Sequence, residues 1–288
     1  MRVVSAVLRE LQYALNKLIF PNALSLDWDN TLNFGDRINP FILSKLTSKR
    51  VVLDQSRYRK RFTCIGSILD RTYVDNTVVW GTGFIRSESY PKTKKLNIKA
   101  VRGPLTKQIF DNYSVPCPPI YGDPSIFMSD FIPSTNNEKK YTLGLIPHYA
   151  ESFETLDKII SQSRFAADIL LININDHPTK VVNVITCCSC VASSSLHGCI
   201  MADIYYVPCF HVKISSNVIG GNFKFDDYRL GLDSGLFHHL DLAEKGLDLD
   251  ILLENIKHAN GISSESILFA KERLINSFPF QHLSYSLN

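Results

Sequence analysis

The sequence predicts an α/β protein whose parallel strands alternate with helices. Short runs of apolar and β-branched residues are separated by stretches with helical spacing, which is typical of repeated βαβ units. The chain has 288 residues, of which 45% are hydrophobic and 20% are charged, a mixture that excludes disorder, collagen and coiled coil as the main architecture. A polar, turn-rich segment at residues 129–140 divides the chain. We therefore expect two Rossmann-like halves that face a cleft, where a ligand would bind.

The first element is an amphipathic helix over residues 3–20, ended by Pro21. Its apolar side chains recur at helical spacing, at Val4, Val7, Leu8, Leu11, Leu15, Leu18 and Ile19. We expect this face to pack against the body of the protein. The alternative is docking to a membrane surface, with Arg2, Arg9 and Lys17 at the lipid headgroups.

Strands and helices alternate through the rest of the chain. We expect strands at residues 50–53, 77–80, 99–101, 143–146, 169–174, 190–192 and 205–207. We expect helices at residues 39–46, 104–110, 153–163, 179–186 and 197–203. The N-terminal half, with the amphipathic helix, would span residues 1–130, the C-terminal half residues 131–280, and a loose tail residues 281–288.

The segment LSLDWDNTL at residues 24–32 matches the strand and D-x-D-x-T pattern of haloacid-dehalogenase phosphohydrolases. In that interpretation Asp27 is the nucleophile, Asp29 is the acid/base, and both hold Mg²⁺. Such an enzyme also needs a later lysine and an acidic pair on separate strands. The available pair, Asp226 and Asp227, lies in a segment that does not resemble a strand end, so this interpretation is the weaker one.

The turn at Asn33, Gly35 and Asp36 lies directly before an expected helix, where free backbone N–H groups bind anions well. The same pattern is common in simple turns that cap a helix. Between residues 57 and 107 twelve Lys or Arg residues accompany three acids, which suits an anionic ligand or surface. The net charge of the whole chain is only +3, which does not indicate a nucleic-acid partner.

Two further turns of the first half follow expected strands. Gly81 and Gly83 would let a ligand or another backbone segment approach closely, although a tight turn explains them equally well. Arg102 ends another strand and precedes Gly103 and Pro104. An arginine there can form a bidentate pair with a carboxylate or a phosphate.

The strongest single motif is SSSLHG at residues 193–198, between an apolar strand and an apolar helix. Three hydroxyl groups, the imidazole of His197 and helix N-terminal amides converge there. Such a group suits an anion, and the imidazole can act as a general acid.

The seven cysteines do not form a regular disulfide or zinc pattern. Three of them lie together, at Cys187, Cys188 and Cys190, near His197 and Cys199, but the paired C-x₂-C spacing is missing. The N-terminus lacks the features of a signal peptide, and the longest uncharged stretch is too polar for a bilayer span. We expect a reduced, cytoplasmic protein that holds no metal.

Taken in order, six blocks resemble the polysaccharide pyruvyltransferase family. They lie at residues 33–40, 79–84, 101–106, 121–125, 143–149 and 193–209. The resemblance implies a GT-B-like fold and transfer of the pyruvyl group of phosphoenolpyruvate onto two hydroxyls of a sugar, which gives a ketal and phosphate. The acceptor would be a sugar or lipid-linked oligosaccharide of a cell-surface or exopolysaccharide precursor. Peripheral contact with the inner face of the plasma membrane stays open.

The resemblance also implies that Arg102 and His197 bind the donor. Many members carry an arginine two positions before this histidine, where the chain has Ser195. Part of the donor's negative charge must then be met elsewhere, and the candidates are Arg86, Lys92 and Lys224.

The chemistry of ketal formation assigns further roles. His197 would supply a proton, and Asp36 would act as base toward a sugar hydroxyl. No metal or cofactor is required. The residues expected to bind the donor are Asn33, Gly35, Gly81, Gly83, Ser194, Ser195 and Lys224.

Two alternative functions fit the same fold. A GT-B-type glycosyltransferase would use a nucleotide sugar and release a nucleotide rather than phosphate. A non-catalytic glycan-binding protein would bind sugar without turnover.

Overall fold

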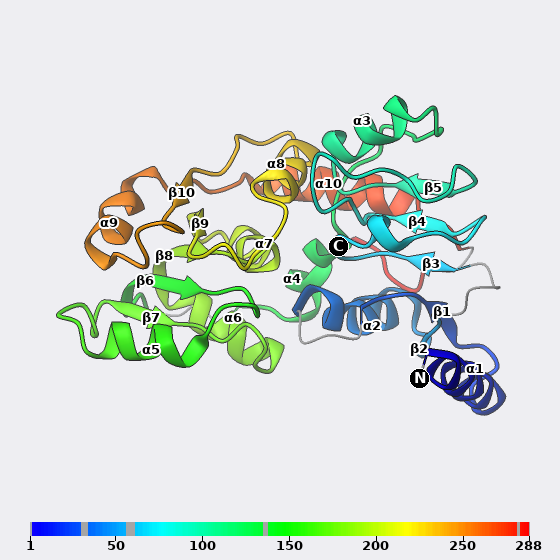
Figure 1. Ribbon diagram of the computed structural model, residues 1–288, viewed down its shortest axis with the longest axis horizontal. Coiled ribbons are helices and arrows are strands. Elements are labelled where there is room, and N and C mark those ends of the chain that lie inside the picture. The colour runs from blue at the N-terminus through cyan, green and yellow to red at the C-terminus, as the bar shows by residue number, and fades with distance from the viewer. Residues whose placement is uncertain (1, 30–33, 56–60, 135–137, 281–282, 288) are drawn as a thin grey trace. The chain divides into compact units, whose positions relative to one another are not determined.

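The computed structural model describes residues 2–29, 34–55, 61–134, 138–280 and 283–287, with side chains from Val7 onward. Two compact units make up these residues (Figure 1). The first contains the described residues of 1–31, 35–125 and 269–288, and the second those of 32–34 and 126–268. Both units are α/β with parallel sheets, so the predicted α/β class with parallel strands is confirmed.

The first unit has strands in the parallel order β2-β1-β3-β4-β5. They are β1 (Leu24–Leu26), β2 (Val51–Leu53), β3 (Phe62–Thr63), β4 (Val78–Trp80) and β5 (Asn97–Ala100). β1 pairs with β2, β3 to β5 pair in sequence, and a parallel bridge between Asp27 and Thr63 joins the two groups. The order reverses between β1 and β3. In open parallel sheets ligands bind beyond the carboxyl ends of strands at such a reversal.

Helices and turns of the first unit are α1 (Arg2–Ile19), α2 (Phe34–Thr47), η1 (Leu69–Arg71), α3 (Pro104–Asn112) and the later part of α10 (Ser264–Asn276). α2 tolerates Pro40 because the side-chain amide of Asn39 donates to the carbonyl of Asp36, which the missing N–H of Pro40 would otherwise reach. α10 is tied to β4 by Trp80, whose Nε1 donates to the carbonyl of Leu274 at 3.0 Å.

The orientation of α1 corrects the sequence prediction. Its polar side contacts the first unit, since Tyr13 shares a hydrogen bond with Ser25 and Lys17 donates to the carbonyl of Ala23. The predicted apolar face is exposed, at Val7, Leu8, Leu11, Leu15, Leu18 and Ile19. The expectation that this face packs against the body is therefore wrong. In the part of the chain that is described, no helix is long and apolar enough to cross a membrane.

The second unit repeats the strand order of the first, as β7-β6-β8-β9-β10. Its strands are β6 (Tyr141–Ile146), β7 (Ile169–Leu171), β8 (Cys188–Ser193), β9 (Cys209–Lys213) and β10 (His239–Asp241). Here the order reverses between β6 and β8. Its helices are α4 (Met128–Phe131), α5 (Phe153–Ser161), α6 (Pro178–Thr186), α7 (Leu196–Ile204), α8 (Phe223–Gly231) and α9 (Leu249–Glu254), with η3 (Asn255–His258).

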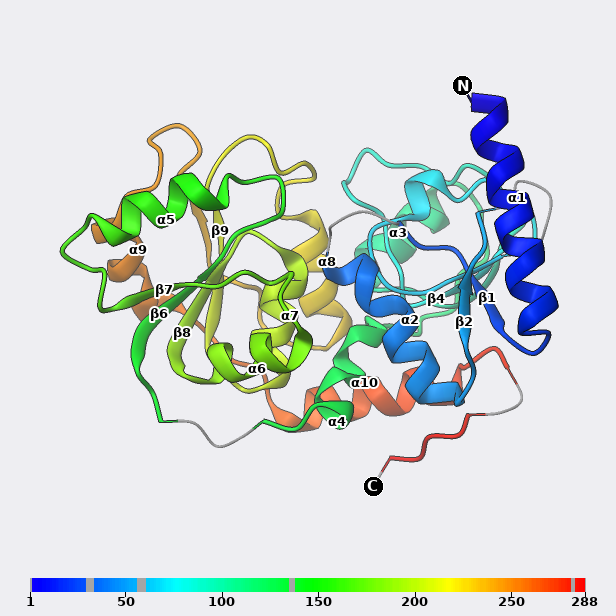
Figure 2. The same cartoon turned by 90° about the horizontal axis from the view of Figure 1, so that it is seen from below.

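Helices cover both faces of this second sheet. Alternate residues of β6, such as Leu143 and Leu145, pack with Leu156 of α5 and Leu252 of α9. The opposite face of the sheet contacts α7, all nine residues of which are buried. Figure 2 shows α5 and α7 on opposite sides of these strands.

One predicted strand is wrong. Residues 205–207 follow α7 in a turn, in which Tyr206 has a φ of 56°, and the strand begins later, at Cys209. The apolar run has another explanation, since Tyr205 is buried and its hydroxyl donates to the carbonyl of Ile132. This error hid the residues of β9 from the prediction.

Candidate functional site

The SSSLHG motif lies at the strand-order reversal of the second unit. β6 ends at Ile146 and β8 at Ser193, and these two residues are partners in the parallel ladder. The turn after β8 is bonded to the turn after β6, because the backbone N–H of His148 donates to Ser194 Oγ at 2.8 Å. The motif and His148 therefore share one edge of one sheet.

Ser193 holds the backbone of this edge rather than facing outward. Its buried Oγ lies 3.0 Å from the carbonyl oxygen of Ile146 and accepts a hydrogen bond from the N–H of Ser195. Gly198 lets α7 approach it, since a Cβ at this position would lie 2.3 Å from Ser193 Oγ. Ser195 is the N-cap residue of α7 and makes no side-chain capping bond.

A buried cation lies near two imidazoles at this edge. His197, on α7, and Lys224, on α8, are both buried, and Lys224 is only 6% exposed. The pKa of His148 is lowered to about 4, chiefly by burial and further by its electrostatic interactions with Lys224 and His197. The two imidazoles and the ammonium are thus close enough to influence one another. A buried cation beside two imidazoles favours an anionic ligand.

Three more polar residues of this unit were not predicted as site residues. The register of β8 and β9 places His211 beside Ser193. His211 Nδ1 lies 2.9 Å from His239 Nδ1, and His239 Nε2 lies 2.7 Å from Asp226 Oδ1. The sequence pattern indicates Asp226 only as part of an acidic pair. His211 was missed because the strand was predicted at 205–207 and not at β9.

This chain of hydrogen bonds selects a tautomer for each ring. Because a carboxylate at Asp226 only accepts, a neutral His239 carries its proton on Nε2 and accepts on Nδ1. His211 must then donate from Nδ1, which leaves its Nε2 with the lone pair. Burial, with smaller contributions from His239 and Lys224, lowers the pKa of His211 to about 3, so this ring is neutral at pH 7.

The corresponding edge of the first unit holds Arg102. The guanidinium is fully buried and donates to Ser67 Oγ at 2.7 Å and to the carbonyl of Phe84 at 2.6 Å. It also lies over Gly83, where a Cβ would come within 2.6 Å of Arg102 Cζ. Arg102 therefore organises the turns after β3 and β4, in addition to any contact with a ligand.

Asp36 lies in the first turn of α2 and is buried. It packs against Gly66, which has a φ of +108° and where a Cβ would come within 2.8 Å of Asp36 Oδ1. Gly66 in turn accepts hydrogen bonds from Thr82 Oγ1 and from the N–H of Gly83. These contacts connect the surroundings of Asp36 with the glycine turn beneath Arg102.

Other predicted residues fall at different places. Asn33 lies outside the described residues. Gly35 lies in the first turn of α2, and Gly81 has a φ of +93° and packs against Pro124, where a Cβ would come within 2.2 Å of the ring. The three cations considered as replacements for the missing arginine differ in burial. Arg86 and Lys92 are exposed, whereas Lys224 is buried.

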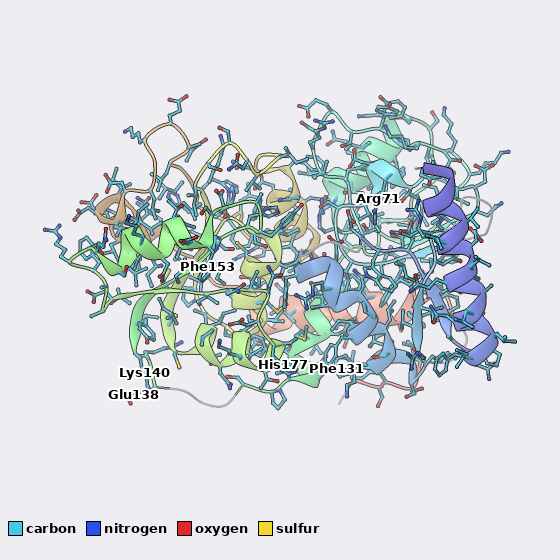
Figure 3. All side chains as sticks on the ribbon, turned by 60° about the horizontal axis from the view of Figure 1, so that its bottom comes forward. Arg71, Phe131, Glu138, Lys140, Phe153 and His177 are labelled. Carbon is cyan, nitrogen blue, oxygen red and sulfur yellow. The ribbon has the colours of Figure 1, made fainter. Side chains whose placement is uncertain are left out.

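Both aspartates of the D-x-D-x-T segment form ion pairs. The carboxylate of Asp27 accepts from Arg61 at 2.6 Å, and Asp29 lies 3.4 Å from Arg71. A cavity of about 120 Å³ lies here, lined by Arg9, Asp27, Gln55, Arg61, Arg71 and Tyr73 (Arg71 is labelled in Figure 3). These ion pairs give Asp27 a structural role that the phosphohydrolase pattern does not require.

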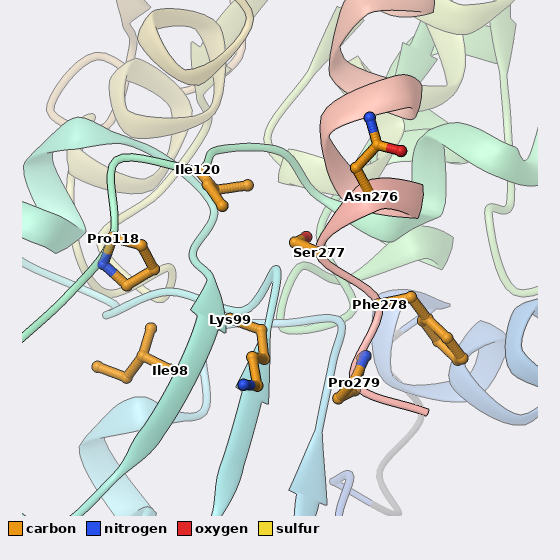
Figure 4. A pocket seen from close by; sticks show the side chains of 8 residues that line it. All are labelled: Ile98, Lys99, Pro118, Ile120, Asn276, Ser277, Phe278 and Pro279. Carbon is orange, nitrogen blue, oxygen red and sulfur yellow. The ribbon is translucent and has the colours of Figure 1, made fainter. Parts of the chain in front are cut away.

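A larger cavity of the first unit holds none of the predicted site residues. It has a volume of about 430 Å³ and lies where the segment after α10 passes β5 (Figure 4). Its lining includes Ile98, Ile120 and Phe278, with Lys99 as the charged group. The sequence motifs therefore lie at the sheet edges and not in this cavity.

Comparison with known proteins gives one family and two relatives. Residues 15–216 match the family described as polysaccharide pyruvyl transferase. The chain is 32% identical over 204 residues to the uncharacterized protein L143 of Acanthamoeba polyphaga mimivirus, which covers 68% of this chain and 70% of that protein. It is 26% identical over 206 residues to the succinoglycan biosynthesis protein ExoV of Rhizobium meliloti (strain 1021), covering 68% of this chain and 60% of ExoV. No solved structure matches the chain.

Proposed function

The chain belongs to the polysaccharide pyruvyl transferase family, and we propose that it moves the pyruvyl group of phosphoenolpyruvate onto two hydroxyls of one sugar. The products are a pyruvate ketal and inorganic phosphate. We propose as acceptor a sugar or lipid-linked oligosaccharide of a cell-surface or exopolysaccharide precursor, which the relation to a succinoglycan biosynthesis protein supports.

The observation that carries this proposal is the buried ammonium of Lys224 beside imidazoles at the carboxyl edge of the second unit. Phosphoenolpyruvate presents a carboxylate and a phosphate, and a site for it needs cations and oriented donors away from bulk water. Lys224 supplies a buried ammonium, and the imidazoles of His148 and His197 lie near it. Lys224 is thus the best replacement for the arginine that is absent at Ser195.

The proposed reaction needs balanced proton transfers. The methylene carbon of the donor gains a proton, one sugar hydroxyl attacks C2, phosphate leaves, and the second hydroxyl attacks the same carbon. Two hydroxyl protons are released, of which one balances the new methyl group and the other the leaving phosphate. We assign the proton donor to His197 and the base toward the first hydroxyl to Asp36.

Arg102 would bind the donor, together with Asn33, Gly35, Gly81, Gly83, Ser194 and Ser195. We further propose that the two Rossmann-like halves face a cleft in the GT-B-like manner. The support for this arrangement is that each unit has the same strand order and carries its predicted residues at a carboxyl edge. The proposed reaction takes place in the cytoplasm and uses no metal or cofactor.

A screen of sugar acceptors with phosphoenolpyruvate tests the function. We expect phosphate release that depends on the acceptor, and a product heavier by one pyruvyl ketal. Release of a nucleotide from a nucleotide sugar would instead indicate a glycosyltransferase. Sugar binding without either release would indicate a non-catalytic glycan-binding protein.

A pair of lysine variants tests the site. Lys224→Met should lower turnover on the order of a hundredfold, because it removes the buried charge that we propose to bind the donor. Lys92→Met is the matched control, since Lys92 is exposed, and should keep near-normal turnover. Equal activity of the two variants, with both folded by circular dichroism, would contradict the assignment of Lys224.

A further inference from the structure

The exposed face of α1 is a continuous apolar surface. Leu8, Leu11 and Leu15 are each more than half exposed, and Leu18 is 80% exposed. Val7 and Ile19 lie beside them and are also more than half exposed. An exposed row of six aliphatic side chains on one helix is the kind of surface that proteins cover with a partner.

The spacing along this face is that of a helix which pairs with another helix. The four leucines at positions 8, 11, 15 and 18 follow one another at intervals of three, four and three, and Val4 precedes them by four in the sequence. Alternation of three and four places leucine at both seam positions of the heptad pattern. A helix that packs on a sheet carries a wider and less regular apolar stripe.

The opposite side of α1 is already used within the first unit. Tyr13 is bonded to Ser25, and Lys17 donates to the carbonyls of Pro21 and Ala23. These contacts hold the helix with its leucines pointing away from the unit to which it is attached. Burying the leucines on the same unit would require the helix to turn and break these hydrogen bonds.

The residues beside the leucine row favour a protein partner over an anionic lipid surface. Gln12 and Ile19 flank the row on one side, and Val7 and Ala14 flank it on the other. Helices that lie on a membrane carry Lys or Arg on the polar face that meets the headgroups. Here Lys17 is bonded to carbonyls of its own unit, while the neutral flanks would not repel an identical helix.

We propose that α1 is a self-association element, whose leucine row packs against the leucine row of α1 in a second copy of this chain. A usual stable interface removes about 800 Å² from each partner. Six aliphatic side chains that are each more than half exposed supply a large part of such an area. This inference is independent of the proposed function.

Light scattering or sedimentation of the full chain, over concentrations of about 1 to 100 μM, tests the proposal. We expect the wild type to reach the mass of two chains and Leu11→Asp to remain at the mass of one. Ile219→Asp is the matched control, because Ile219 is 61% exposed and Leu11 is 60% exposed. This control should associate like the wild type.

Hydrogen exchange of the α1 amides gives a second measurement that does not rely on a variant. In the wild type, exchange across α1 should slow as the concentration rises, because the leucine row becomes covered. A wild type of one-chain mass at the highest concentration would overturn the proposal, as would Leu11→Asp associating normally. Binding of the monomeric wild type to vesicles of phosphatidylserine and phosphatidylcholine would overturn it in favour of a lipid partner.

Discussion

At the scale of single residues, predicted site residues make contacts that stabilise the turns around the site. Arg102 was expected to bind the donor, and its guanidinium is bonded to Ser67 and to the carbonyl of Phe84. Gly83 was expected to admit a ligand, and the structure shows that the side chain of Arg102 occupies the space beside it. The sequence predicts that Arg102 and Gly83 belong to one site. It could not predict the contacts, because they join turns that follow different strands.

Gly198 gives the sharpest test at this scale. Gly198→Ala should lower the free energy of unfolding by about 1–3 kcal/mol, because the added Cβ would lie 2.3 Å from Ser193 Oγ. It should also lower turnover by displacing His197, the preceding residue. Gly235→Ala is the matched control, since no atom lies within 4 Å of its added Cβ. Denaturant unfolding of both variants checks this, and equal stabilities would contradict the packing argument.

At the scale of elements, prediction succeeded where a periodic pattern decided the structure. The strand at 143–146 is confirmed, and an apolar run defines it. The helices at 104–110 and 179–186 are also confirmed, because each combines apolar periodicity with a proline at its start. α8 was missed because its charged residues Lys224, Asp227 and Arg229 are buried, so it lacks an amphipathic pattern. Arg229 instead makes a buried ion pair with Asp203 at 2.7 Å. Lys224 was named from the sequence, but its burial required the structure.

The hydrogen-bonded histidines connect three elements, β9, β10 and α8, and they make a specific prediction. His211 should carry its proton on Nδ1 at pH 7, because Asp226 fixes the tautomer of a neutral His239. Nitrogen chemical shifts of labelled imidazoles measure this directly. In Asp226→Asn the amide can donate as well as accept, so we expect a mixture of tautomers at His211. A wild-type His211 protonated on Nε2 would show that the hydrogen bonds run in another order.

At the scale of the whole molecule, the two units share a strand order although the sequence shows no internal repeat. Both sheets reverse after their first strand, and in both the predicted residues follow strands at the carboxyl edge. Parallel sheets allow few strand orders, so two segments can share an order without similar sequences. The sequence therefore predicts the edges at which residues gather. It predicts the orientation of α1 poorly, because amphipathicity does not distinguish burial in the same chain from burial against a partner.

Acid should destabilise the whole molecule through two histidines of the second unit. Burial, assisted by Lys224, lowers the pKa of His148 to about 4 and that of His211 to about 3. In the unfolded chain both titrate near 6.5, so between pH 6.5 and 4 the unfolded state binds protons that the folded state excludes. The free energy of unfolding must then fall as the pH falls through this window.

Asp203 has the opposite effect on the free energy of unfolding and reduces the net loss on acidification. Burial raises its pKa to about 6, so the folded state gains a proton on acidification before the unfolded state does. Two histidines with larger pKa shifts outweigh one carboxyl group. We therefore expect the free energy of unfolding to fall on the order of a few kcal/mol between pH 6.5 and 4.5.

Urea unfolding at both pH values measures this loss of stability. The double variant His148→Gln with His211→Gln should reverse the slope, because only the contribution of Asp203 then remains among these three groups. A double variant that loses as much stability on acidification as the wild type would show that other groups control the acid sensitivity.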